Sequence, residues 1–351
     1  MVEPVPGLVT ADASALSGDL ASVAPMADSP RPTIGMAFDR NLPPALILDF
    51  ARRLDEAGAE RLWVIEDCFR TAGVSLASAA LAVSERLQVG IGILPSLARN
   101  PAIMAMEFAT LARMAPGRFL PGIGHGVQSW MGQIGVRPAS PLTAFEEVVT
   151  SVKRLITGEE VTVDGRYVHL DSVKLDYPPD VVPPVLGGVQ GPKSLQLVGR
   201  VADGVILVDP GTPSYVKAAL ELVGRPNGPE DPFDVTVFGP ICLRDDRQEA
   251  RAIMTPWLAS MIEGDGFALS ALPFADDLKT IYREAGADAL AGLPDDWWVE
   301  LAPAGTRDDI EQHLDALGRA GATSLAFFTA EDAETAVGQL DDVVGLVTSW
   351  S

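Results

Sequence analysis

The side chains that could carry chemistry in this chain stand at the ends of short apolar runs. Glu66 and Asp67 directly follow the run 62–65, and His125 follows the run 119–123. Carboxylates and imidazoles are side chains that can transfer protons or contact a bound ligand near neutral pH. Because adjacent residues of a strand face opposite sides, we expect only one of the two carboxylates to point into a shared site.

Glycines surround His125. Gly122, Gly124 and Gly126 remove side chains from the backbone where the run 119–123 ends, so a flat ring or a phosphate could approach the main chain there. A lone glycine-rich motif is a weak signal. A tight strand exit with a satisfied histidine explains this segment equally well.

A second glycine-rich segment covers residues 187–194, which read Gly-Gly-Val-Gln-Gly-Pro-Lys-Ser. Its proline is typical of a helix start, and a helix N-terminus offers free N–H groups and the positive end of a dipole. Lys193 adds a charge in a chain that has only five lysines. The pattern favours binding of an anion, most simply a cofactor phosphate, over an unliganded turn.

Other kinds of site find no support in the sequence. It contains no His-x-x-x-His or CxxC spacing for a metal, so we expect no metal, and no Gly-x-Ser-x-Gly for acyl transfer. Cys68 and Cys242 lie far apart, which predicts packed thiols in a reducing cytoplasm.

The net charge of −22 and the pI near 4.4 argue against nucleic acid or an anionic membrane as partner. Residues 1–30 lack the basic start of a signal peptide, and no apolar run is long enough to span a bilayer. We therefore expect a cytoplasmic protein that acts on a small molecule.

Apolar runs alternate with amphipathic segments along most of the chain. Strands are predicted at 33–38, 62–65, 87–94, 119–123, 184–188, 204–208, 234–243 and 324–328. Helices are predicted at about 43–58, 76–83, 100–114, 141–158, 191–201, 213–223, 306–320 and 332–349. This alternation predicts an α/β fold, a (β/α)8 TIM barrel with insertions, and the alternative is an open doubly wound sheet. In a barrel the candidate residues would meet at the carboxyl ends of the strands.

We expect a flexible tail over 1–30 and a single domain over 31–351. Two insertions interrupt the barrel: a hairpin at about 159–178 with an Asp-Gly turn, and an irregular helical excursion at about 246–300.

Several motifs together resemble one known family. They are Gly-Arg-Phe-x-x-Gly-Ile-Gly-x-Gly at 117–126, Arg-Asn-Pro at 99–101, Thr-Gly-Glu at 157–159, and Gly-Pro-Lys-Ser-Leu at 191–195 with Ala-Asp-Gly at 202–204. Their order and spacing resemble the bacterial luciferase-like family. Within it the chain looks most like the F420-dependent reductases similar to methylenetetrahydromethanopterin reductase. The similarity covers residues 33–210 well and the C-terminal third loosely.

The resemblance implies a luciferase-like TIM barrel with a deazaflavin or flavin laid across its mouth. Residues 92–93 match a strand bulge that backs the ring, often with a non-prolyl cis peptide. Residues 125–127 match the loop over the pyrimidine side, and 187–194 match the phosphate side. The predicted cofactor-binding residues are Glu66, Gly92, Ile93, His125, Gly126, Val127, Gly187, Gly188, Val189, Gln190, Gly191, Pro192 and Lys193.

The sequence also departs from the family pattern. Sugar-phosphate dehydrogenases of this branch carry Asp-His where this chain has Asp67-Cys68, and a glutamate where it has Val127. Their acid and base are therefore missing, and oxidation of a sugar phosphate is not expected. His125 and Asp67 are the substitute candidates for catalysis.

Together these expectations predict an F420-dependent oxidoreductase that transfers a hydride between F420 and an unidentified small organic substrate. The alternatives are an FMN-dependent luciferase-like monooxygenase and a catalytically silent flavin-binding barrel. A Schiff-base lyase using Lys193 is disfavoured because that lysine falls inside a helix start. Trp130, Met131 and Trp257 suit either an apolar pocket or the core. A homodimer is implied by the resemblance alone.

Overall fold

The computed structural model describes residues 31–208, 210–225 and 232–350. Eight strands, all parallel, close into a barrel in the order β1-β12-β9-β8-β7-β4-β3-β2. The predicted TIM barrel is confirmed, and the open doubly wound sheet is wrong. The predicted tail at 1–30 lies outside the described residues.

The barrel strands follow the predicted runs closely. They are β1 (Thr33–Phe38), β2 (Arg61–Val64), β3 (Gln88–Pro95), β4 (Phe119–Gly124), β7 (Leu186–Gly188), β8 (Gly204–Leu207), β9 (Asp234–Gly239) and β12 (Ser324–Phe328). The helices that cover them are η1 (Pro44–Leu46), α1 (Ile47–Ala57), α2 (Gly73–Ala82), α3 (Pro101–Met114), α4 (Gln128–Gln133), α5 (Pro141–Ile156), α6 (Pro192–Val201), α7 (Pro213–Val223), α12 (Arg307–Ala320) and α13 (Ala333–Trp350).

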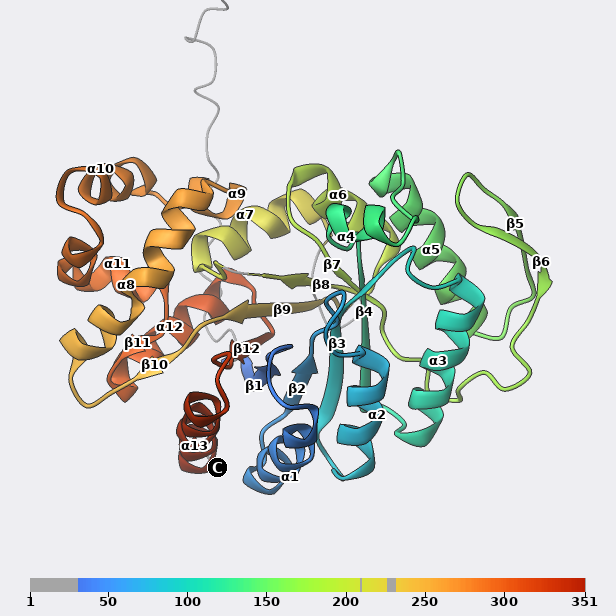
Figure 1. Cartoon of the computed structure of the whole chain (residues 1–351), viewed down its shortest axis with the longest axis horizontal. Coiled ribbons are helices and arrows are strands. Elements are labelled where there is room, and N and C mark those ends of the chain that lie inside the picture. The colour runs from blue at the N-terminus through green and yellow to red at the C-terminus, as the bar shows by residue number, and fades with distance from the viewer. Residues whose placement is uncertain (1–30, 209, 226–231, 351) are drawn as a thin grey trace, which may run out of the picture.

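Both predicted insertions are present, on opposite sides of the barrel (Figure 1). The hairpin pairs β5 (Val161–Asp164) with β6 (His169–Val173) in antiparallel register. The excursion contains α8 (Arg247–Gly264), α9 (Phe267–Ser270), α10 (Ala275–Ala285), η2 (Ala287–Gly292) and α11 (Asp295–Leu301). These helices enclose a second apolar core of their own, around Leu258, Leu278 and Trp298.

Two predictions about the elements need correction. The strand expected at 234–243 is two strands, because Pro240 interrupts it and has no N–H to donate to a ladder. The second piece, β10 (Cys242–Leu243), leaves the barrel and pairs with β11 (Ala304–Gly305). Helix α4, in the loop after β4, was not predicted from the sequence.

The inside of the barrel is filled by large side chains beside glycines. Trp63 and Phe238 meet edge to face with ring centroids 5.4 Å apart. Gly90 makes room for Trp63, since a Cβ at Gly90 would lie 2.3 Å from the indole ring. The barrel is therefore a packed core rather than a pore, and ligands must bind at its ends.

The helices of the described part of the chain are all too short or too polar to cross a membrane.

Candidate functional site

The carboxyl ends of the barrel strands bring together the residues that the sequence singled out. Glu66 and Asp67 follow β2, His125 follows β4, and residues 189–191 connect β7 to α6, which begins with Pro192 and Lys193. In the barrel, β3 lies between β2 and β4, and β7 follows β4. The predicted residues therefore share one arc of the barrel mouth.

His125 links two of these loops directly. Its Nε2 lies 3.0 Å from Oγ of Ser194, in the first turn of α6. The imidazole packs against the Phe145 ring with centroids 5.2 Å apart, while its buried Nδ1 has no hydrogen-bond partner. Burial lowers the pKa of His125, and the backbone of Pro141 opposes part of that shift. The ring is therefore neutral near pH 7.

The N-terminus of α6 suits an anion. Side chains cap the starts of α3, α5 and α7, but no side chain caps α6. Gly191 precedes it with φ of +79°, and a Cβ there would meet no atom within 4 Å. Lys193 is exposed beside this turn. Uncapped N–H groups, open space and a lysine together fit a cofactor phosphate.

The two carboxylates after β2 face different partners. Asp67 Oδ2 lies 3.0 Å from Nε of Arg40, which follows β1. Glu66 instead forms an ion pair with Arg99, which follows β3. Burial raises the pKa of Asp67 while Arg40 lowers it in part, so Asp67 retains a proton to higher pH than an exposed aspartate.

The bulge predicted in β3 is confirmed. The pairing of β3 with β4 shifts register between Ile91 and Leu94, and the Gly92–Ile93 peptide bond is cis. A second non-prolyl cis bond joins Cys68 to Phe69 in the loop after β2. Nothing in the sequence pointed to the second one.

The glycines at the strand ends have a packing role that the sequence did not show. A Cβ on Gly188 would lie 2.2 Å from Cγ2 of Ile93, and one on Gly124 would lie 2.8 Å from Ile93 Cδ1. A Cβ on Gly92 would lie 2.8 Å from the ring of Phe238. The glycines therefore make room for protein side chains, above all Ile93.

The remaining predicted residues lie around the same arc. Gly126 has φ of +69°, Val127 is exposed, and Gln128 donates from Nε2 to the carbonyls of His125 and Gly126. Gly187 packs under α6, and the Val189 side chain is buried, so only its backbone can face a ligand.

A cavity of about 280 Å³ lies beside this arrangement, between Gln190, Pro210 and the α8–α9 corner that includes Trp257. Trp257 thus lines a pocket, whereas Met131 belongs to the core.

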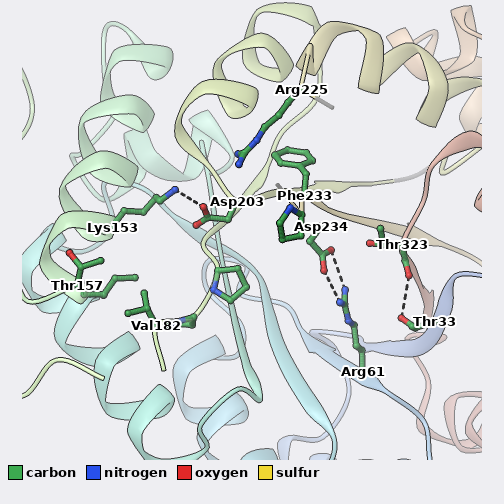
Figure 2. Close-up of a pocket in the computed structure, with 14 residues that line it drawn as sticks. Thr33, Arg61, Lys153, Thr157, Val182, Asp203, Arg225, Phe233, Asp234 and Thr323 are labelled. Carbon is green, nitrogen blue, oxygen red and sulfur yellow. Dashed lines mark hydrogen bonds and ion pairs between the residues drawn. The ribbon is translucent and has the colours of Figure 1, made fainter. Parts of the chain in front are cut away.

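A cavity of about 780 Å³ opens instead at the amino ends of the strands, with Thr33, Arg61 and Thr323 among its walls (Figure 2). In TIM barrels that face contributes stability rather than catalysis. Among the residues that the structure describes, no group of three or more His, Cys, Asp or Glu side chains could hold a metal ion.

Comparison with known proteins places this geometry in a family. Residues 24–324 match the family model of luciferase-like monooxygenases. The chain belongs to the luciferase-like monooxygenase family. Its members are oxidoreductases, so the predicted family and enzyme class are confirmed.

Relatives within the family carry related activities. The chain is 29% identical to a 5,10-methylenetetrahydromethanopterin reductase of Methanolobus tindarius over 223 residues, 63% of this chain and 68% of the relative. It is 35% identical to an F420-dependent glucose-6-phosphate dehydrogenase of Beutenbergia cavernae over 132 residues, 36% of this chain and 39% of the relative.

Among solved structures, the coenzyme F420-dependent tetrahydromethanopterin reductase of Methanopyrus kandleri shares the fold. The TM-score is 0.73 at 19% identity, over 91% of this chain and 98% of that one.

The packing of Ile93 against Gly188 predicts a measurable coupling. Gly188→Ala should lower the free energy of unfolding by about 2 kcal/mol, because its methyl group would overlap Ile93. Combining it with Ile93→Ala should cost less than the sum of the two single changes. Urea unfolding of the three variants tests this. Gly338→Ala in α13, where a Cβ meets no atom within 4 Å, is the control, and strictly additive losses would contradict the packing.

Proposed function

We propose that this protein is an F420-dependent oxidoreductase that transfers a hydride between F420 and a small organic substrate bound in the barrel mouth. The observation that carries the proposal is the junction of His125 with the uncapped N-terminus of α6, where a lysine and open space adjoin a neutral imidazole. The F420-dependent relatives support it.

F420, when bound, supplies the hydride at C5 of its deazaflavin ring. The residues of the chain bind and orient it. Lys193 and the N–H groups of Gly191, Lys193 and Ser194 would hold the phosphate, and residues 187–190 would line the same side. Residues 92–93 would back the ring, with residues 125–127 and Glu66 around its edge.

His125 and Asp67 are the proposed proton-transfer groups. A neutral imidazole can accept a proton at one ring nitrogen and donate one from the other, and Nε2 of His125 already shares a hydrogen bond with Ser194 Oγ. Asp67, whose burial favours the protonated carboxyl, is the proposed acid on the other side of β3. The glutamate of the sugar-phosphate branch is absent at Val127, so we propose a substrate other than a sugar phosphate.

Experiments can distinguish this function from its alternatives. An FMN-dependent monooxygenase would consume O2 during turnover, and a silent barrel would bind the cofactor without turnover. A Schiff-base lyase would form an imine at Lys193 that borohydride traps. That function is disfavoured because Lys193 is the second residue of α6 and does not lie at the end of a barrel strand.

We also propose that the protein is a cytoplasmic homodimer. Ile103, Met106 and Met114 of α3 are 46%, 50% and 56% exposed, and their spacing puts them on one side of the helix. An exposed apolar stripe of this kind suits a second copy of the chain.

Lys193→Ala should weaken F420 binding about tenfold, because a contact between charged groups is worth on the order of 1.5 kcal/mol. Fluorescence titration with F420 measures this. Lys217→Ala, at an exposed lysine of α7, is the control. An unchanged affinity in Lys193→Ala would remove the phosphate assignment.

His125→Ala should lower kcat about a hundredfold while changing the F420 dissociation constant by less than about threefold. Because burial lowers the pKa of His125, wild-type kcat should fall only below about pH 6.5, where the imidazole gains a proton. Steady-state kinetics on a substrate found by screening with reduced F420 tests both points. Equal losses in kcat and affinity would make His125 a binding or structural residue.

Met106→Glu should convert the dimer to a monomer, because it puts a charge into the apolar stripe of α3. Sedimentation velocity measures the mass of the particle. Ile253→Glu, at an equally exposed apolar residue of α8, should leave the dimer intact. A wild-type monomer would refute this interface.

A further inference from the structure

The carboxylate of Glu66 is fully engaged with other parts of the protein. Its Oε1 lies 2.5 Å from Nη1 of Arg99 and its Oε2 lies 2.9 Å from Nη2, a bidentate pair. Oε2 also accepts a hydrogen bond of 2.8 Å from the backbone N–H of Gly73, the first residue of α2. Since no side chain of its own caps α2, Glu66 provides that cap from the end of β2.

Arg99 is held from a second direction. Its Nε lies 3.3 Å from Oε2 of Glu107, on α3. Burial raises the pKa of Glu107 while Arg99 opposes the shift, and the hydrogen bond to Glu66 raises the pKa of Arg99. A guanidinium held by two carboxylates has little freedom to move.

These contacts tie together the loops on either side of the proposed ring site. Glu66 precedes Asp67 in the loop from β2 to α2, and Arg99 lies in the connection from β3 to α3, six residues after Ile93. Asp67 faces the opposite way, toward Arg40. Fixing Glu66 therefore fixes where the chain presents Asp67 relative to Ile93.

We propose that Glu66 and Arg99 form a positioning pair that holds the loop carrying Asp67 against the β3 bulge and so shapes the seat of the cofactor ring. Neither side chain then needs to touch the reacting atoms. This inference rests on the proposed function and refines the role of Glu66, from a ligand contact to a support for its neighbours.

The chain contains a matched control at the other end of the barrel. Arg61 and Asp234 form an equally bidentate pair, with Nη2–Oδ2 at 2.6 Å and Nη1–Oδ1 at 3.1 Å, and Figure 2 shows it in the wall of the amino-end cavity. The exposed fractions are similar: 12% and 14% for this pair, 21% and 11% for Arg99 and Glu66. A purely structural role would make the two pairs behave alike.

The experiment compares Arg99→Lys with Arg61→Lys, two variants that keep the charge and lose the bidentate geometry. The probes are F420 and its phosphate-free ribityl-deazaflavin core, titrated by fluorescence, with melting temperatures measured alongside. Both variants should melt at lower temperature than the wild type. Only Arg99→Lys should weaken binding of the core, by about tenfold, since small displacements of a preorganised site have effects of this size or larger.

Glu66→Gln is the second variant, because it keeps the side-chain shape and can still accept from Gly73. It should weaken core binding in the same direction by a smaller factor. Unchanged core binding in both Arg99→Lys and Glu66→Gln, or an equal loss in Arg61→Lys, would overturn the positioning role and leave the proposed function standing. A wild type that binds neither probe would overturn both.

Discussion

The packing of the Ile93 side chain at the mouth of the barrel constrains everything proposed around it. Ile93 leaves the line of β3 at the register shift and fills the space beside Gly124 and Gly188. Any Cβ at those glycines would collide with it, so β4 and β7 must end in bare backbone. These two ends lie side by side in the barrel, with Gly124 opposite Gly188. The shape of the mouth thus follows from one apolar side chain and the glycines that accommodate it.

Charged side chains in the loops around the barrel mouth are held by ion pairs. The chain carries a net charge of −22, yet the two carboxylates after β2 each have an arginine partner from a neighbouring strand end. Carboxylates paired with arginines through charge-assisted hydrogen bonds keep fixed positions, although burial still raises the pKa of Asp67. On the other side of β3, the described rim offers a neutral imidazole, an uncapped helix and an exposed lysine. The arc is therefore divided into a side with two carboxylates and a side with an uncapped helix N-terminus and a lysine, a division that suits the proposed cofactor.

The sequence predicted the barrel because the apolar runs are short, regularly spaced and separated by amphipathic helices, which is a local signal. It also predicted which loops converge, since strand ends in a barrel share one face. Contacts between residues that are distant in the sequence were harder to predict. Arg40 and Asp67 are 27 positions apart in sequence, and nothing local links them. Helix α4 is only six residues long and lacks a periodic stripe. The glycines were recognised, but the sequence did not show that the side chain of Ile93 packs against Gly124 and Gly188.

The central claim, that the arc between β2 and α6 is a site for F420, is tested most directly by selectivity between two cofactors. The purified protein should be titrated in parallel with F420 and with FMN, following fluorescence. The account predicts F420 binding at micromolar concentration or tighter and clearly weaker FMN binding. Preference for FMN would move the protein to the flavin-dependent monooxygenases, and binding of neither would contradict the account of the site.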